Sequence, residues 1–262
     1  MVGLNPRVSS YLRERLTRGP LHMTLLDPAS VAAEDGVEIA LRAKSAGTDC
    51  FMVGGSTGVT EANLDALVKG IKGATALPVI HFPSHAGAIS RHVDAIWFMS
   101  MLNSRDPRFI TREQMLGAPI LKLLRIEPIS LAYVIVEPGM TVGRVSQADA
   151  LPRTMEGAEM AAAYALAAEY FGMKFVYLEA GSGAGTPVPT THVRAVKEAV
   201  DIPVIVGGGI RTGEQARTLL EAGADLLVTG TIAEKRGYEA LEDIVREVRG
   251  RSRAAVVAGA GR

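Results

Sequence analysis

Short apolar runs recur along the chain at fairly regular intervals, and each is rich in β-branched or aromatic side chains. Runs of this length and composition predict buried β-strands. Polar or glycine-rich residues follow each run, as expected where a strand ends in a loop. The eight predicted strands cover residues 21–26, 49–53, 77–82, 95–100, 132–136, 175–178, 203–206 and 225–229.

The segments between these strands carry apolar residues at helical spacing. Ser30 is expected to cap the first of these helices and Gly47 to end it, while Thr60 is expected to cap the second. The stretch 139–152 is expected to be a polar loop. Helices are predicted at 8–18, 31–46, 60–72, 111–124, 154–170, 191–200 and 212–222, with a last one ending near 248.

Strands that alternate with helices pair in parallel, and eight such units in a chain of this length favour a closed, modified (β/α)8 TIM barrel. Its third unit is expected to be irregular, because too few residues separate strands 77–82 and 95–100 for an ordinary helix. A doubly wound open sheet is the alternative. No linker divides the chain, so residues 1–248 are predicted to form one domain and residues 249–262 a disordered tail.

The composition excludes several classes of protein. Lys+Arg and Asp+Glu both number 28, so no net charge favours nucleic acid or an acidic membrane. Cys50 is the only cysteine, which excludes an intramolecular disulfide and fits a reducing compartment. The N-terminal segment has no apolar core of a signal peptide, and no apolar run reaches the ~18 residues of a membrane span. A cytoplasmic protein is therefore expected.

Glu179 ends the strand 175–178 and precedes a glycine-rich turn. Glycines let backbone N–H groups face an anion, so this carboxylate would lie beside a phosphate cradle. Gly208-Gly209 and Gly230-Thr231 hold equivalent places after the last two strands. In a barrel these loops meet at the end that carries the active site. Each loop could be a simple turn, but the three together predict a phosphate ligand.

Asp27 follows the first strand, on the opposite side of the same end. Together with the Ser56 hydroxyl it could hold Mg²⁺, which takes few protein ligands and keeps most of its waters. The alternative is that Asp27 caps the following helix. His81 and His85 lack the spacing and companions of a transition-metal site.

Gly54 to Gly58 match the nucleophile elbow G-x-S-x-G of serine hydrolases. That elbow turns directly from strand to helix, whereas here Val59 and a cap at Thr60 intervene, and no HGGG motif accompanies it. A serine hydrolase is therefore disfavoured. Walker A, a complete dinucleotide fingerprint and H-E-x-x-H are also absent.

Several motifs, taken in order, resemble those of the geranylgeranylglyceryl phosphate synthases of archaea and their bacterial heptaprenylglyceryl phosphate synthase relatives. The resemblance covers nearly the whole chain. Its most specific parts are HMTLLDP, MVGGSTGV, SMLNSRDPRFI, YVIVEPG with VGRV, YLEAGSGAGTPV and VGGGIRT with TGT.

The resemblance implies a modified TIM barrel that joins sn-glycerol 1-phosphate to a polyprenyl diphosphate through an ether and releases diphosphate. It implies that Glu179 accepts the hydroxyl proton and that Asp27 and Ser56 bind Mg²⁺. The residues implied in glycerol phosphate binding are Tyr177, Leu178, Glu179, Ala180, Gly181, Ser182, Gly183, Gly208, Gly209, Gly230 and Thr231.

The chain departs from the family pattern on the diphosphate side, with Ala29-Ser30 after Asp27-Pro28 and Ser84-His85 after the third strand. The archaeal-type motifs favour a twenty-carbon prenyl chain, and the resemblance implies a dimer or a hexamer with transient membrane contact at most. Another phosphate-binding barrel enzyme, or a barrel without activity, remains the alternative. The candidates for an apolar prenyl groove are 81–82, 97–101 and 133–136, although core packing would explain each equally well.

Overall fold

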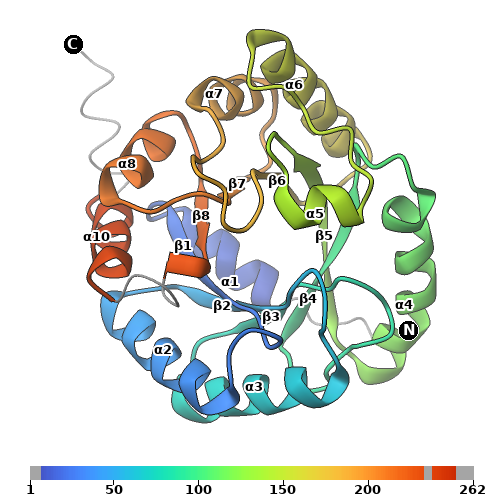
Figure 1. The fold of residues 1–262 in the computed structure, drawn as a ribbon, viewed down its shortest axis with the longest axis vertical. Coiled ribbons are helices and arrows are strands. Elements are labelled where there is room, and N and C mark those ends of the chain that lie inside the picture. Colours follow the sequence, from blue (N-terminus) through green and yellow to red (C-terminus); the bar gives the residue numbers. More distant parts are fainter. Residues whose placement is uncertain (1–6, 233–237, 252–262) are drawn as a thin grey trace.

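Eight parallel strands close into a barrel in the order β1 to β8 (Figure 1). The computed structural model describes residues 7–232 and 238–251. The (β/α)8 barrel is confirmed, and the open-sheet alternative is wrong because β8 pairs with β1. The strands are β1 Leu21–Leu26, β2 Cys50–Val53, β3 Val79–His81, β4 Ala95–Met101, β5 Glu127–Ile135, β6 Phe175–Glu179, β7 Val204–Gly207 and β8 Leu226–Thr229.

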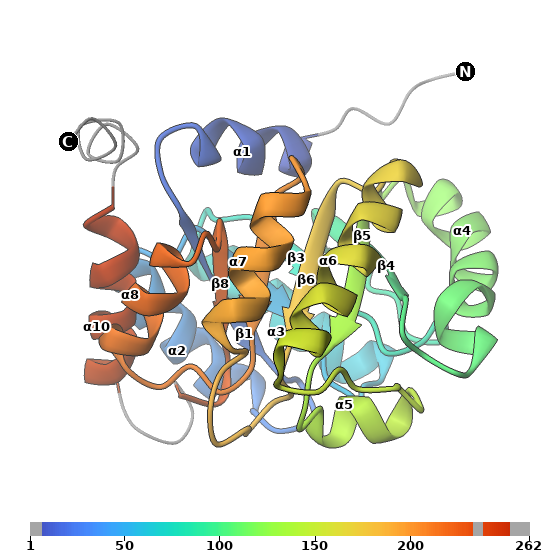
Figure 2. The same ribbon diagram turned by 90° about the horizontal axis from the view of Figure 1, so that it is seen from above.

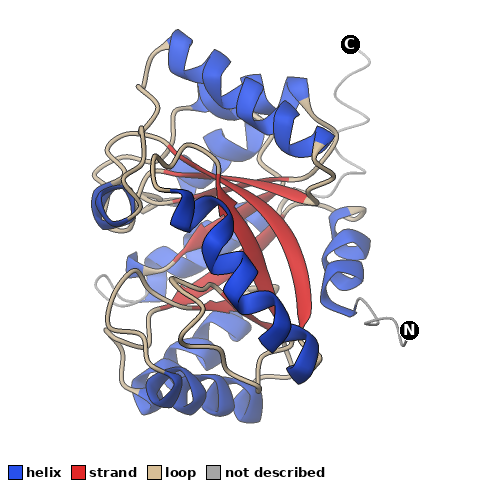
Figure 3. Cartoon of the chain, turned by 90° about the vertical axis from the view of Figure 1, so that its right-hand side faces the viewer, coloured by secondary structure: helices blue, strands red, loops and turns tan. Residues whose placement is uncertain are grey.

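Most of the helices surround the barrel, whose strands cross the centre of the molecule at a tilt (Figure 3). Two helices lie elsewhere: α1 crosses one end of the barrel and α5 lies at the other (Figure 2). The described helices are α1 Arg7–Leu16, α2 Ala33–Ala46, α3 Glu61–Ala74, α4 Glu113–Leu124, α5 Met140–Val145, α6 Met155–Tyr170, α7 Thr190–Ala199, α8 Gly213–Glu221 and α10 Tyr238–Arg249.

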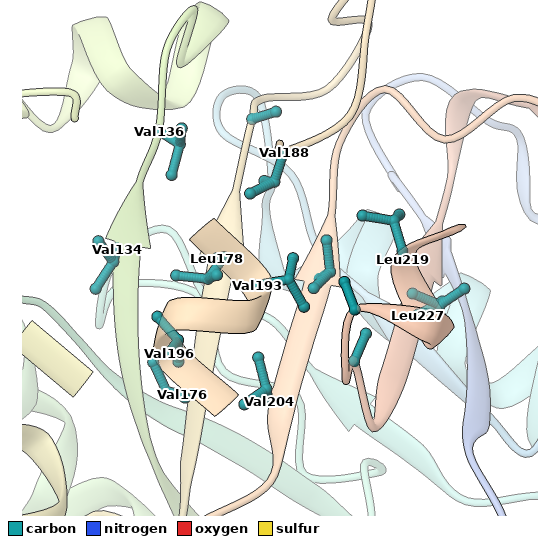
Figure 4. Packing of buried hydrophobic residues seen from close by; sticks show 14 of the residues in the cluster. Val134, Val136, Val176, Leu178, Val188, Val193, Val196, Val204, Leu219 and Leu227 are labelled. Carbon is teal, nitrogen blue, oxygen red and sulfur yellow. The ribbon is translucent and has the colours of Figure 1, made fainter. Parts of the chain in front are cut away.

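Successive residues of a strand point to opposite faces, and this alternation divides the core. On β6, Phe175 and Tyr177 pack with the residues inside the barrel. Val176 and Leu178 instead pack against the surrounding helices, where Val193 and Val196 of α7 meet them (Figure 4). Each strand is therefore buried on both faces, as a parallel sheet requires.

Helix α1 closes the end of the barrel opposite the candidate site. Leu12 and Leu16 are buried under the barrel interior. The buried Glu127 carboxylate accepts hydrogen bonds from the N–H groups of Val8 and Ser9 and from the Ser9 hydroxyl, at 2.6–3.2 Å. A carboxylate at a helix N-terminus satisfies N–H groups that have no partner within the helix and meets a favourable dipole.

The connection after β3 differs from the others. Residues 82–94 contain neither a helix nor a strand before β4 begins at Ala95. A single π-helical turn, Arg108–Arg112, then leads into α4. The connection between β3 and β4 consequently adds no helix to the outer layer, and the neighbouring helices are α3 and α4.

Several predicted boundaries need correction. Helix α2 begins at Ala33, and its N-cap is Ala32, which has no side-chain hydrogen bond, so the predicted Ser30 cap is wrong. The predicted end at Gly47, in the left-handed region, and the Thr60 cap are confirmed. The predicted loop 139–152 contains α5, and β5 begins five residues earlier than expected, at 127 rather than 132.

The predicted tail also starts too early. Arg249 still belongs to α10 and its guanidinium hydrogen-bonds to the Gly47 carbonyl and, at 2.9 Å, to the Asp49 carboxylate. Arg251 contacts Glu221. The remainder of the predicted tail, residues 252–262, lies outside the described residues. Within the described part of the chain, no helix combines the length and the apolar character that crossing a membrane requires.

Candidate active site

Two cavities open at the end of the barrel where the strands finish. The larger has a volume of about 510 Å³ and the smaller about 280 Å³. A few residues line both cavities and form a wall between them, which we call the shared wall. It consists of Leu25, Glu179, Ser182, Gly230 and Thr231.

Glu179 is the only ionisable side chain of the shared wall, and it is 6% exposed. The Tyr133 hydroxyl donates a hydrogen bond to its Oε2 at 3.1 Å, and the Gly181 N–H donates to its Oε1 at 2.6 Å. Burial raises the pKa of this carboxyl, while the bonds from Gly181, Tyr177 and Tyr133 partly oppose the rise in pKa. A carboxylate with a raised pKa is suited to accept a proton near neutral pH.

Two glycines of β7 and its loop make room for these groups. A Cβ on Gly207 would lie 2.0 Å from the Tyr177 hydroxyl, and one on Gly208 would lie 2.3 Å from Glu179 Oε1. Gly208 also has φ +81°, which side chains disfavour. The glycine run therefore leaves space for the Glu179 carboxylate, in addition to lining the smaller cavity. The sequence analysis foresaw only the second of these roles.

The smaller cavity is built mainly from backbone. The N–H groups of Ser182, Gly183, Gly208 and Gly209 donate to no other described residue. The Ser182 and Thr231 hydroxyls lie 3.0 Å apart. Unpaired N–H groups and hydroxyls around one cavity are what a phosphate needs. The structure thus brings together the three predicted loops.

Two predicted binding residues lie elsewhere. Leu178 and Ala180 are fully buried against the helices outside the barrel and line neither cavity. Tyr177 does line the smaller cavity, since it points into the barrel.

The larger cavity is mostly apolar. Of the predicted groove residues, one group lines it, namely Phe82, Trp97, Phe98, Met99, Met101 and Tyr133. The rings of Phe82, Tyr133 and Tyr177 meet at centroid distances of 5.0–5.9 Å where this cavity approaches Glu179. His81 is not part of the lining; it is buried, and burial lowers its pKa to about 3, so its ring is neutral.

Helix α4 supplies one side of the larger cavity, and the sequence analysis missed it. Its lining residues recur at helical spacing on one face, namely Glu113, Gln114, Gly117 and Leu121. The spacing was available as a signal, but it is also the spacing of an ordinary core-facing helix. Helix α5 adds Val142 and Val145.

Asp27 lies on the polar rim of the larger cavity with Ser30, Ser56, Ser84 and His85. Its Oδ1 accepts a hydrogen bond from the Ala29 N–H at 2.9 Å, and burial raises the pKa of the carboxyl. The Asp27 carboxylate also lies against Gly55, where a Cβ would be 2.3 Å from Oδ1. Asp27 does not cap α2, whose N-cap is Ala32.

The rim fits Mg²⁺ better than a transition metal. Its side-chain oxygens are those of one carboxylate and nearby hydroxyls, which suit an ion that keeps several waters and binds substrate phosphates. Residues 7–232 and 238–251 contain no group of three or more His, Cys, Asp or Glu side chains able to hold a metal. Asp27 and Ser56 are thus compatible with the predicted Mg²⁺ role.

The sequence of this chain is similar to known proteins over most of its length. Residues 10–249 match the PcrB family. Geranylgeranylglyceryl phosphate synthase of Thermococcus kodakarensis is 52% identical over 93% of this chain and 98% of its own, and that of Methanothrix thermoacetophila is 50% identical over 94% and 97%.

Solved structures agree. The crystal structure of (S)-3-O-geranylgeranylglyceryl phosphate synthase from Thermoplasma acidophilum, in complex with its substrate sn-glycerol-1-phosphate, has a TM-score of 0.87 and 46% identity, covering 91% of this chain and 97% of that one. A thiamine phosphate pyrophosphorylase from Pyrococcus furiosus, with 16% identity and a TM-score of 0.58, shares the fold alone. The chain therefore belongs to the PcrB family of geranylgeranylglyceryl phosphate synthases.

Proposed function

We propose that this protein transfers a geranylgeranyl group from its diphosphate to the C3 hydroxyl of sn-glycerol 1-phosphate. The observation that carries the proposal is the position of Glu179, on the wall shared by an N–H-lined cavity and an apolar one. Two substrates of opposite character would meet at one carboxylate. The similarity to synthases of this name over nearly the whole chain supports the same reaction.

Glycerol phosphate would occupy the smaller cavity. Its phosphate would accept hydrogen bonds from the unpaired N–H groups of 182–183 and 208–209 and from the Thr231 hydroxyl. The C3 hydroxyl would then face Glu179, whose carboxylate accepts the proton. The attacking oxygen forms a bond to C1 of the prenyl group while the bond from C1 to the diphosphate oxygen breaks, so diphosphate leaves with the electron pair.

The prenyl chain would occupy the larger cavity, where burial of its methylene groups contributes roughly 0.8 kcal/mol each. The diphosphate would lie at the polar rim, where Asp27 and Ser56 would hold Mg²⁺. When bound, Mg²⁺ neutralises the negative charge that develops on the leaving diphosphate. The Ala29 N–H, which donates to Asp27 Oδ1, would hold the carboxylate in place for that role.

A homo-oligomer, either a dimer or a hexamer, is part of the proposal. Exposed apolar side chains on α4 and α6 support it, because surfaces of this kind are covered in most soluble proteins. They are Met115, Leu116, Ile120, Leu123, Met155, Met160, Tyr170 and Phe171. Light scattering coupled to gel filtration would give the number of subunits.

Product analysis tests the proposed reaction most directly. The protein, Mg²⁺ and either glycerol 1-phosphate enantiomer would be incubated with farnesyl, geranylgeranyl or heptaprenyl diphosphate, and the products identified by mass spectrometry. We expect an ether from the sn-1 enantiomer and geranylgeranyl diphosphate. An ether formed faster with heptaprenyl diphosphate would contradict the chain length, and no ether with any pair would contradict the reaction.

A further inference from the structure

Arg211 links two of the loops that line the smaller cavity. It follows Gly208-Gly209 in the loop after β7, yet its side chain reaches the loop after β6. Its Nη2 donates to the carbonyl of Ala184 at 2.7 Å and to that of Gly183 at 3.1 Å. Its own N–H donates to Gln215 Oε1 at 2.7 Å, which fixes the Arg211 backbone to the first turn of α8.

The loop that Arg211 contacts is a tight turn with defined donors and acceptors. The Ala184 N–H donates to the Gly181 carbonyl at 3.1 Å, and Gly183 has φ +78° at the third position of this turn. Glu179 Oε1 holds the start of the turn through the Gly181 N–H. Arg211 holds its end, so the unpaired N–H groups of Ser182 and Gly183 are fixed between two anchors.

The planar peptide bond makes this anchoring directional. The carbonyls of Gly183 and Ala184 share their planes with the N–H groups of Ala184 and Gly185, so Arg211 fixes the two peptide planes that directly follow the Ser182 and Gly183 donors and limits the rotation of the turn. The two carbonyls face Arg211, while Ser182 and Gly183 line the smaller cavity. The guanidinium carries several N–H donors in a rigid plane, which suits this double contact.

Charge gives the smaller cavity a polarity. Among the described residues that line it, Arg211 is the only cation and Glu179 the only anion. A phosphate dianion would be repelled by the carboxylate and attracted toward the guanidinium. A bound glycerol phosphate would therefore place its phosphate at the Arg211 side and its free hydroxyl at the Glu179 side.

We propose that Arg211 is a positioning residue that orients the phosphate-binding turn and sets which end of glycerol phosphate meets Glu179. The inference rests on the proposed function, because it assigns the phosphate end of that same site. It concerns ground-state binding of one substrate only. Arg211 lines the smaller cavity and not the larger one, so prenyl diphosphate binding should be independent of it.

The test compares Arg211→Met, Arg211→Lys and the matched control Arg217→Met. Arg217 lies on α8, its side chain is about half exposed, and it forms a salt bridge with Glu214. For Arg211→Met we expect the KM for sn-glycerol 1-phosphate to rise roughly 10- to 100-fold, the range for losing hydrogen bonds to a charged group. The KM for prenyl diphosphate should change little, because Arg211 does not line the larger cavity. Arg211→Lys, which keeps the charge without the planar fork, should fall between wild type and Arg211→Met, and Arg217→Met should match wild type.

Calorimetric titration of each variant with sn-glycerol 1-phosphate separates this inference from the proposed function. If the wild-type protein binds glycerol phosphate and Arg211→Met binds it equally well, the inference is overturned while the function stands. If the wild-type protein neither binds it nor makes an ether, the proposed function is contradicted.

If Arg211→Met is too unstable to measure, the Arg211→Lys variant decides. Equal KM values for Arg211→Lys and wild type would contradict the need for a planar guanidinium. A parallel rise in both KM values would indicate general damage and would also contradict the inference.

Discussion

The two cavities that meet at Glu179 are built in opposite ways. The smaller is made by loops after β6, β7 and β8, and its binding groups are mostly backbone N–H groups held by tight turns. The larger is made by side chains of β4, α4, α5 and the loop after β3, on the side where the third connection has no helix. The positions of glycines shape the smaller cavity, whereas the larger cavity lies beside the connection that contains no helix.

This difference explains what each cavity can tolerate. In the smaller, an added methyl group would collide at 2.3 Å with Glu179 when placed on Gly208. In the larger, a Cβ on Gly117 would meet its neighbours, Ala86 and Ile89, at 3.8 and 3.9 Å, which is ordinary contact. We therefore expect substitutions near the smaller cavity to affect chemistry and those in the larger to affect substrate choice.

The largest effect is expected at the wall between them. Glu179→Gln keeps the size of the side chain but removes the base, so kcat should fall about 10²- to 10⁴-fold while glycerol phosphate still binds. Steady-state kinetics and calorimetry measure the two effects. Glu137→Gln, an exposed residue after β5 that lines neither cavity, is the control. Turnover close to that of the wild type would remove Glu179 from the base role.

The raised pKa of Glu179 predicts a pH dependence of activity. A base must be deprotonated, so kcat/KM should fall as pH drops through a pKa above the model-peptide value for glutamate. Tyr133→Phe removes a hydrogen bond that lowers this pKa, and the acidic limb should therefore move to higher pH. Because the folded-state pKa is raised, Glu179 contributes stability at low pH that is lost as pH rises through it. Kinetic pH profiles of both proteins check the shift; an unmoved limb would indicate that Tyr133 does not tune the carboxyl.

An intermediate effect is expected on the rim of the larger cavity. Asp27→Asn removes the only carboxylate of the proposed Mg²⁺ site, and the Mg²⁺ concentration for half-maximal activity should rise by about tenfold or more. A Mg²⁺ titration of initial rates measures this. Glu34→Gln, in the first turn of α2 and exposed, should leave the titration unchanged. The same titration curve for Asp27→Asn and wild type would contradict the assignment.

The smallest effects are expected within the larger cavity. Gly117→Ala should stabilise the protein by about 0.5–1 kcal/mol, because alanine favours the helix and has room. Gly117→Leu should fill the space between α4 and 86–89 and raise the KM for geranylgeranyl diphosphate without changing that for glycerol phosphate. Thermal melts and kinetics of the pair separate stability from specificity. Equal kinetics for Leu and Ala would place the prenyl chain elsewhere.

The same contrast explains what could be predicted from the sequence. Strands, barrel closure and the meeting of the three glycine-rich loops follow from apolar runs and from glycines at fixed places after them. The hydrogen bonds from Tyr133 to Glu179 and from Arg211 to Ala184 were not foreseen, because each joins two different strands or loops of the barrel; Tyr133 was named only as a candidate for the groove. The family resemblance implied Leu178 and Ala180 as binding residues, but the alternation of side chains along the strand turns them away from both cavities.

The groove could not be delimited for a related reason. Residues such as Phe98 and Leu121 have the composition and spacing of core residues, and the connection after β3 contains no helix that would pack beside them. Whether a strand is covered by a helix depends on how the whole chain packs, so no single sequence motif encodes it. The start of α2 shows a similar limit, since Ser30 is a favourable capping residue but the helix begins three residues later, at Ala33.

The helix-free connection after β3 also has a thermodynamic consequence. A barrel with one helix missing leaves apolar surface of β4 and α4 in contact with water whenever the larger cavity is empty. A prenyl chain in that space would replace the missing layer, and the substrate would act as a removable part of the hydrophobic core. Ligand that binds only the folded state stabilises it by about 2.7 kcal/mol at a hundred times its Kd. The melting temperature of the protein would then report how well a given prenyl chain completes the fold.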